Sequence, residues 1–295
     1  MASGKDLIGT KSARMLIVGY PGGGKTGGLA SLANVGYKIR ILDFEGNYAP
    51  LLYNTKPEFL HNIEIKTLQD KLAMGSKFIE PVGIPTAFKE GLEAMKSWKV
   101  KDSNGNVIED LGNPSDWGND TIVVVDSLTS MSEAAMDRAT KLMNKGPGTI
   151  TSAVWGAAVN DVRNMIKLMA RDDNKYHLIV LGHLQMISSE DFIKQGDSPE
   201  IKETKMEAIK DDLIPTKLFP TAVTKNQSMK IAKELSTMIT AKKIKKHGKT
   251  MRVLETTAGE ELDLKFPANA PDSVPLETGL AQLFEILGYT PPIST

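Results

Sequence analysis

One eight-residue segment has the residue types and spacing of a phosphate-binding loop. Residues 19–26 read GYPGGGKT and fit the pattern G-x-x-x-x-G-K-[ST] at every position. By average residue usage this pattern arises by chance in about one chain of this size in a hundred. Glycines let backbone N–H groups curve around a phosphate, and a helix that follows adds the positive end of its dipole. We therefore expect a nucleotide to bind here through its phosphates.

Two side chains at the end of this loop supply a charge and a metal ligand. Lys25 can reach the β- and γ-phosphates, and the hydroxyl of Thr26 can bind Mg²⁺. The alternative is a glycine-rich turn with an incidental lysine, which the strand and helix patterns on either side disfavour. The motif and its expected metal partner predict these nucleotide-binding residues: Gly19, Tyr20, Pro21, Gly22, Gly23, Gly24, Lys25, Thr26, Gly27 and Asp126.

Asp126 is the carboxylate expected to hold the water shell of the metal ion. It ends TIVVVD (121–126), the type of buried strand that carries this acid beside a phosphate loop. Thr26 and Asp126 are thus the predicted Mg²⁺ residues, the latter through water. Alternatively, Asp126 caps the helix that SLTSMSEAAMDRATKLM (127–143) predicts. ATP is the expected nucleotide, because the Asn144-Lys145 pair continues with Gly146-Pro147 and so lacks the Asn-Lys-x-Asp signature of guanine specificity.

Short apolar runs separated by helical patterns must position these residues. The runs MLIV (15–18), KIRILDF (38–44), TIVVVD (121–126) and HLIVLG (177–182) lack polar alternation, which predicts strands covered on both faces. PTAFKEGLEAMKSW (85–98) and the segment from Trp155 to Met169 have the spacing of helices. This alternation predicts an α/β fold with a mostly parallel sheet and helices on both faces.

The predicted organisation is a tail (1–13) followed by a single domain (14–295). Asn104-Gly105 predicts a two-residue hairpin turn within an insertion at about 98–117. Residues 184–220 are too long for an ordinary connection and predict a mobile functional loop. Residues 236–295 predict a β-rich C-terminal extension, in which 238–257 form a hairpin turning at His247-Gly248, 262–266 a strand and 275–289 a helix.

Composition excludes several classes of protein. The 295 residues are 41% hydrophobic, and 36 Lys and Arg balance 36 Asp and Glu, so neither a disordered chain nor a uniformly basic nucleic-acid coat fits. Cysteine is absent, which removes disulfides, thiolate metal sites and cysteine nucleophiles. No apolar run approaches the ~18 residues that span a bilayer, and the first residues lack a signal-peptide pattern. We therefore expect a cytoplasmic protein without a membrane partner.

The order of these motifs resembles the RecA/Rad recombinase ATPase core. Asp43 and Glu45 follow the strand after the phosphate loop, VVVDS comes next, and Gly182-His183-Leu184-Gln185 ends another core strand. More closely, DFEGN, PSDWGNDTIVVVDSLT, AVWGAAVNDVRNMI and IVLGHLQ resemble the phage-encoded RecA-like ATPases that include single-strand annealing proteins. The resemblance covers roughly residues 14–257.

The resemblance implies a RecA-like fold, MgATP hydrolysis and roles for particular residues. Glu45 would be the catalytic glutamate and His183 the sensor of the γ-phosphate, with Gln185 as a second candidate. The alternatives are a solvated strand-end acid for Glu45 and a neutral core histidine for His183. The resemblance also implies a homo-oligomer, a ring or a filament, in which a neighbour supplies a cation. Lys242 and Lys243 are the candidates for that cation, and Arg252 is the alternate.

One basic segment is the predicted site for single-stranded DNA. Residues 221–252 contain nine basic residues against Glu234 alone, a net charge of +8, and such segregation favours contact with a phosphate backbone. A solvated basic hairpin is the alternative. The predicted DNA-binding residues are Lys242, Lys243, Lys245, Lys246, Lys249 and Arg252. Residues 184–220 carry five lysines against eight acids, with only Phe192 and Phe219 as aromatic residues, and give DNA binding no support.

The expected function is ATP-dependent binding and annealing or pairing of single-stranded DNA in phage recombination, with a single-strand binding protein as a further expected partner. The alternative is a nucleotide-gated assembly, loader or packaging ATPase whose basic surface meets a protein. A small-molecule phosphotransferase, with 184–220 as its lid, is a third interpretation.

Overall fold

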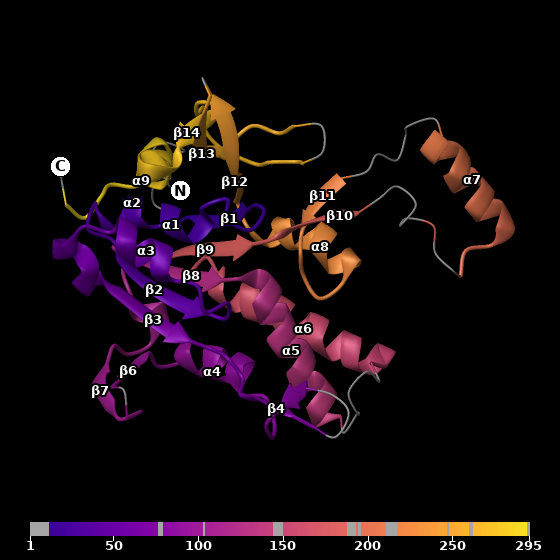
Figure 1. Ribbon diagram of the computed structural model, residues 1–295, viewed down its shortest axis with the longest axis horizontal. Coiled ribbons are helices and arrows are strands. Elements are labelled where there is room, and N and C mark those ends of the chain that lie inside the picture. Colours follow the sequence, from indigo (N-terminus) through magenta and orange to yellow (C-terminus); the bar gives the residue numbers. More distant parts are fainter. Residues whose placement is uncertain are drawn as a thin grey trace, which may run out of the picture.

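An eight-stranded, mostly parallel sheet forms the centre of the protein (Figure 1). The computed structural model describes residues 12–75, 79–102, 104–143, 150–187, 193, 196–210, 217–246, 248–259 and 262–293, except the side chains of 209, 210, 225, 226, 229 and 246. The strand order is β14-β13-β12-β1-β9-β8-β2-β3. The strands are β1 (Arg14–Val18), β2 (Lys38–Asp43), β3 (Ile63–Thr67), β8 (Thr121–Asp126), β9 (His177–Gly182), β12 (Thr237–Lys246), β13 (Lys249–Glu255) and β14 (Ser273–Pro275).

Neighbouring strands from β12 to β3 are parallel, and only β13 and β14 run antiparallel to their neighbours. The four strands predicted from apolar runs are thus confirmed, as is the mostly parallel sheet. β12 lies in the main sheet beside β1, and the residues of its first half, from Thr237 to Ala241, are all buried. The predicted C-terminal extension therefore begins inside the core sheet, and only β13, β14 and the last helix extend it.

Helices cover both faces of the sheet, because alternate strand residues point to opposite sides. In β1, Met15 and Ile17 enter one apolar cluster, while Leu16 and Val18 enter the other. The first face packs against α1 (Lys25–Gly28), α2 (Ala30–Ala33), α3 (Ala49–Asn54) and α9 (Leu276–Ile286). The second packs against α4 (Ala87–Ala94), α5 (Leu128–Leu142), α6 (Ser152–Met169) and α8 (Lys225–Ile231). Short 3₁₀ segments occupy η2 (Pro57–Asn62), η3 (Pro114–Asp116) and η5 (Ala232–Glu234).

Local sequence signals account for the helix starts. Ser127, Thr151 and Thr224 each accept a hydrogen bond from a backbone N–H in the first turn, which caps α5, α6 and α8. In α6 the buried stripe begins at Val154, whereas the side chain of Trp155 lies beside the stripe and is 39% exposed. The helix from Trp155 to Met169 is confirmed, but Trp155 is not part of its buried face.

Two local predictions are corrected, the two-residue turn and the strand at 262–266, while the segment predicted as a mobile functional loop contains secondary structure. The hairpin of β6 (Lys99–Lys101) and β7 (Val107–Asp110) exists, but its turn is longer than two residues, because the Asp102 carboxylate accepts N–H groups from Asn104 and Asn106. Residues 184–220 contain structure of their own: β10 (Leu184–Ile187) pairs with β11 (Lys217–Pro220), and α7 (Pro199–Lys210) lies between them. In place of the strand predicted at 262–266, Lys265 makes a single bridge to Met238.

A second small hairpin, β4 (Leu72–Met74) with β5 (Ile79–Pro81), was not predicted. Several features named from the sequence lie outside the described residues: the tail to residue 11, Asn144 to Pro147, Phe192, His247 and the side chain of Lys246. Ser12 and Ala13 belong to the folded core, since Ser12 donates to backbone carbonyls of Asn174 and Lys175. In the part of the chain that the structure describes, no helix is long and apolar enough to cross a membrane.

His177, at the start of β9, gives the fold a predicted pH dependence. Its ring packs against the rings of Tyr37, Phe284 and Tyr289 at centroid distances of 4.6 to 5.7 Å, and its Nδ1 accepts the Ala13 N–H. Burial lowers the pKa of His177 to about 4. The unfolded chain, with a pKa of about 6.5 there, binds more protons between pH 4 and 6.5, so stability falls as the pH drops through this window.

We expect the His177 contribution to the free energy of unfolding to fall by about 2 kcal/mol between pH 6.5 and pH 5. His177→Gln should be less stable at pH 7, but should lack this part of the pH dependence. Urea unfolding of both proteins at pH 5, 6 and 7 measures the difference. Parallel pH profiles for the two proteins would contradict the assignment.

Candidate functional site

The parallel strands bring the predicted site residues to one edge of the sheet. Val18, Asp43, Asp126 and Gly182 all lie at carboxyl ends of strands, and Val18 pairs in register with Gly182, as Asp43 does with Asp126. The phosphate loop leaves β1 at this edge, and the Gly19 N–H donates to the Gly182 carbonyl at 3.2 Å. Residues far apart in sequence therefore converge because parallel strands end together.

The phosphate loop is packed so tightly that Gly19, Gly23 and Gly24 have no room for a side chain. A β-carbon at Gly23 would lie 2.7 Å from the Ala241 carbonyl oxygen of β12 and 3.1 Å from the Tyr20 carbonyl oxygen. Gly24 has φ +103°, and a β-carbon there would meet Leu276 of α9 and lie 2.9 Å from Arg252 Cδ. The glycines thus allow the loop to pack closely against β12, β13 and α9, in addition to allowing it to curve around a phosphate.

Lys25 and Thr26 extend from the loop toward the strand ends. The side chain of Lys25 is 7% exposed, and its ammonium donates to the Gly19 carbonyl at 2.9 Å. Burial lowers the pKa of Lys25 because it disfavours the charged ammonium. An anionic ligand beside Lys25 would have the opposite effect and favour the charged form. Thr26 Oγ1 donates to Asp126 Oδ2 at 2.8 Å. Burial raises the pKa of Asp126 to about 7, and the Thr26 hydrogen bond opposes this rise.

A short turn after β2 presents Glu45. The Phe44 and Glu45 N–H groups both donate to the Asp126 carbonyl, at 2.6 and 3.1 Å, and Asp43 Oδ1 accepts the Gly46 N–H at 2.7 Å. The Asp43 side chain is fully buried, and burial raises its pKa. Asp43 therefore fixes the turn that positions Glu45, while Asp43 Oδ2 has no hydrogen-bond partner among the described residues.

Glu45, His183 and Lys25 form a continuous chain of polar contacts. His183 Nε2 lies 3.3 and 3.2 Å from the two carboxylate oxygens of Glu45, and His183 Nδ1 lies 3.5 Å from Lys25 Nζ. The hydrogen bond from His183 lowers the pKa of Glu45, although partial burial opposes it. An ionised carboxylate thus faces the phosphate loop, with an imidazole between it and the loop lysine.

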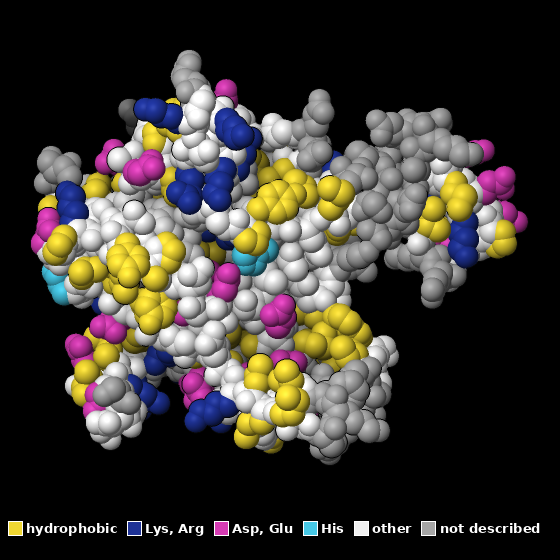
Figure 2. Space-filling view, in the orientation of Figure 1, with side chains coloured by type: hydrophobic (Ala, Val, Ile, Leu, Met, Phe, Trp, Pro, Cys, Tyr) yellow, Lys and Arg dark blue, Asp and Glu magenta, His cyan; other side chains and the backbone are white. Residues whose placement is uncertain are grey.

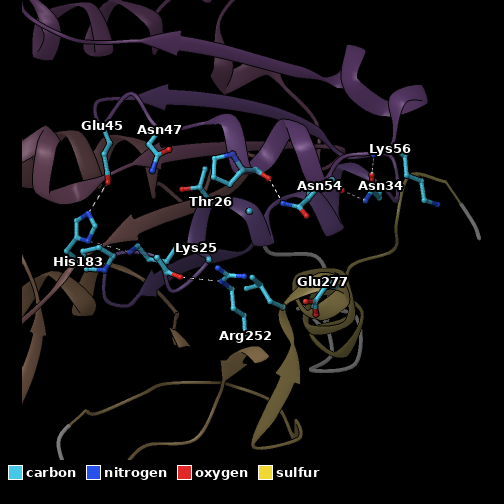
Figure 3. Close-up of a pocket in the computed structure, with 17 residues that line it drawn as sticks. Lys25, Thr26, Asn34, Glu45, Asn47, Asn54, Lys56, His183, Arg252 and Glu277 are labelled. Carbon is cyan, nitrogen blue, oxygen red and sulfur yellow. Dashed lines mark hydrogen bonds and ion pairs between the residues drawn. The ribbon is translucent and has the colours of Figure 1, made fainter. Parts of the chain in front are cut away.

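These groups line a cavity of about 620 Å³ in front of the loop (Figure 3). Its wall contains the predicted residues Pro21, Gly22, Gly24, Lys25, Thr26, Gly27, Glu45 and His183, and also Arg252, which was predicted for DNA and as the alternate cation. Asp126 lies behind Thr26, whereas Gly19 and Tyr20 line a separate cavity of about 390 Å³ that includes Lys242. Sequence reasoning did not identify Asn34, Asn47, Pro50, Asn54, Lys56, Leu276 and Glu277 as wall residues. Of these, Asn47 directly follows the DFEG segment and could have been found from it.

The two candidate sensors occupy different positions. His183 lines the cavity, while the Gln185 side chain donates to Ser228 Oγ of α8 at 2.7 Å. The His183 carbonyl accepts the Thr221 N–H, which follows β11. The strand that leaves His183 is therefore connected to β11 and α8 by direct hydrogen bonds.

The basic residues of the β12–β13 hairpin divide between its two faces, and Lys and Arg side chains gather over this hairpin in Figure 2. Lys242 Nζ pairs with Glu255 at 2.5 Å. Lys243 and Arg252, directly opposite each other in the ladder, lie at the phosphate loop of their own chain. Lys245 and Lys249 are exposed farther along the hairpin.

The hydroxyl of Thr26 and the carboxylate of Asp126 are oxygen ligands that suit a magnesium ion. Mg²⁺ prefers hard oxygen ligands and is usually held by one or two protein groups plus substrate phosphates and water. Among the described residues, no group of three or more His, Asp or Glu side chains is arranged to hold a metal by itself. The pair therefore fits an ion that arrives with a phosphate-bearing ligand, and such an ion would favour the ionised form of Asp126.

The fold and the site together define an α/β protein whose mostly parallel sheet carries a glycine-rich loop and three acidic residues at one edge, which is consistent with Rossmann-like and P-loop-like α/β folds. Comparison with models of known protein families and with curated protein sequences gave no match.

The packing of Gly23 predicts that a single methyl group disturbs the site. Gly23→Ala should push the loop away from Ala241, with a loss of stability of about 1–3 kcal/mol, the scale of overpacking. Gly156→Ala is the matched control: Gly156 lies in α6 with open space around it, so alanine should raise stability by up to about 1 kcal/mol. Thermal unfolding compares the two, and equal effects would contradict the packing argument.

Proposed function

We propose that this protein is a RecA-like P-loop ATPase that acts on single-stranded DNA in phage recombination or annealing. The observation that carries the proposal is the meeting of Lys25, the Thr26–Asp126 pair and the Glu45–His183 pair at one cavity. Each supplies a different requirement of phosphoryl transfer: charge neutralisation, metal binding and activation of water.

The strand order supports the RecA-like assignment. β9, which leads to His183, lies between β1 with the phosphate loop and β8 with the metal carboxylate. This position puts His183 in contact with Glu45 and Lys25, where the terminal phosphate of the proposed nucleotide would lie. The motif order that resembles RecA in sequence thus corresponds to neighbouring positions in space.

In the proposed reaction, Lys25 binds the β- and γ-phosphates, and the backbone of residues 22–26 surrounds them. Mg²⁺, held by Thr26 and through water by Asp126, would neutralise charge on the phosphates. Glu45 accepts a proton from the attacking water, which its lowered pKa permits near neutral pH. His183 contacts both Glu45 and Lys25, so its position depends on whether a phosphate group lies between them.

Two variants test this assignment. Lys25→Ala should abolish tight ATP binding, because it removes the main counter-charge of the phosphates. Glu45→Gln should retain ATP binding but lower kcat by about 10²-fold, the scale of general-base removal. Glu58→Gln, in the exposed η2 segment, is the matched control and should leave both unchanged. Normal turnover by Glu45→Gln would mean that another residue is the general base. Normal ATP affinity of Lys25→Ala would refute the proposed ATP site.

DNA binding is proposed from the charge of the β12–β13 hairpin and from its family resemblance. The exposed Lys245 and Lys249 offer positive charge to a phosphate backbone. The contacts from His183 to Thr221 and from Gln185 to Ser228 offer a route by which the nucleotide could shift β11 and α8. Homo-oligomerisation, as a ring or filament, is proposed on the same resemblance, including a trans role for Lys242 or Lys243.

The salt dependence of binding tests the DNA proposal. Each phosphate neutralised on a single strand contributes about −0.7 to the slope of log K against log salt, so Lys245→Gln with Lys249→Gln should flatten the slope by about 1.4. Lys89→Gln is the control, because Lys89 lies on α4, outside the basic segment, and pairs with Glu93. Fluorescence anisotropy with a labelled oligonucleotide, in a non-hydrolysable ATP analogue, measures the slopes. Salt-insensitive binding by the unmodified protein would refute this proposal.

A nucleotide-gated assembly ATPase with a protein partner is the second candidate. The observation that favours it is the β4–β5 hairpin, where the side chains of Leu72, Met74 and Ile79 are 63%, 84% and 66% exposed. Exposed apolar residues gathered on one small element are typical of protein-binding surfaces. Absence of DNA binding together with partner-stimulated ATP hydrolysis would support this candidate.

A further inference from the structure

Two cations of the β12–β13 hairpin lie at the phosphate loop of the same chain. Arg252 Nε donates to the Gly22 carbonyl at 3.3 Å, and a β-carbon at Gly22 would lie 3.2 Å from Lys243 Nζ. Arg252 also lines the 620 Å³ cavity (Figure 3), and a β-carbon at Gly24 would lie 2.9 Å from its Cδ. The hairpin that sequence reasoning assigned to DNA thus reaches the nucleotide site.

Neither Lys243 nor Arg252 has a charged partner of opposite sign among the residues that the structure describes, although Glu277 lines the same cavity as Arg252. Lys242, on the other face, pairs with Glu255. Like charges directly opposite each other on a strand pair are destabilising. An anionic ligand in the cavity could reach Arg252 and Lys25, which both line it.

The guanidinium of Arg252 has the donors for such a ligand. It carries five N–H groups, and only Nε makes a hydrogen bond within the part of the chain that the structure describes. The remaining N–H groups form the planar fork that binds phosphate oxygens in pairs. The Arg252 stem lies close to Gly24, since a β-carbon at Gly24 would be 2.9 Å from Arg252 Cδ.

We infer that Arg252 binds the phosphate groups of the nucleotide in cis, so that the C-terminal hairpin of each chain completes its own nucleotide site. This inference rests on the proposed ATP binding at the same cavity. It gives Arg252 a role different from backbone contacts with DNA and from action on a neighbouring subunit. The contacts of β12 and α9 with the glycine loop are what bring the arginine to this position.

Equilibrium binding of a fluorescent ATP analogue, without DNA, tests the inference. Loss of a charge-assisted contact should weaken ATP binding by about 10- to 100-fold in Arg252→Gln. Inorganic tripolyphosphate should lose the same factor as a competitor, because the contact is with phosphate. Arg252→Lys should recover part of the loss, since it keeps the charge without the fork. Lys233→Gln, which removes an exposed charge from the same basic segment, should bind normally.

A mixing experiment distinguishes cis from trans action. Excess Lys25→Ala protein has an intact Arg252 but a defective loop, so it could restore tight ATP binding to Arg252→Gln only by supplying the arginine across an interface. No recovery is expected. Recovery would overturn the cis arrangement, and equal affinities of Arg252→Gln and Lys233→Gln would overturn the role of Arg252. Failure of the unmodified protein to bind ATP would instead refute the proposed function.

Discussion

The close contact between the phosphate loop and β12 is the constraint on which the rest of the site depends. The Ala241 carbonyl approaches Gly23 so nearly that only hydrogen fits between them, and Leu276 and Arg252 occupy the space beside Gly24. Because β12 is also a neighbour of β1 in the sheet, the loop is held from below by β1 and from the side by β12 and α9. Its shape is therefore set by tertiary packing before any ligand binds, and pre-organisation of this kind lowers the entropy cost of binding.

Electrostatics at the sheet edge follows from the same geometry. Asp43 and Asp126 are adjacent at the ends of parallel strands, and burial raises the pKa of both carboxyls. Glu45 lies in the turn that follows β2, and its hydrogen bond with His183 lowers its pKa. Asp43 and Asp126 therefore lie where burial disfavours their ionised forms, whereas Glu45 stays ionised and faces the cavity. Such a division assigns different chemical roles to neighbouring carboxyls.

The C-terminal part of the chain makes two sets of contacts, one within the core sheet and one with the phosphate loop. β12 completes the core sheet, while β13 and α9 fold back over the phosphate loop and bring Arg252, Leu276 and Glu277 to the cavity wall. The same hairpin presents Lys245 and Lys249 outward. A movement of the hairpin would therefore change the nucleotide site and the outer basic surface together, which gives a physical basis for coupling between two ligands.

The sequence by itself determined the parts of the structure that depend on local patterns. Short uninterrupted apolar runs such as TIVVVD predict strands covered on both sides, and the glycine-lysine-threonine spacing predicts the loop. From these patterns, the convergence of Lys25, Thr26, Glu45 and Asp126 at one edge followed. Tertiary structure alone decided which side chains face one another across long sequence separations. Lys242 and Lys243 are neighbours in sequence, yet strand alternation pairs one with Glu255 and puts the other at Gly22. Leu276 and Glu277 share the cavity wall with the phosphate loop, some 250 residues away in the sequence. Only the packing of β12, β13 and α9 brings them there, and a local sequence pattern contains no information about that packing.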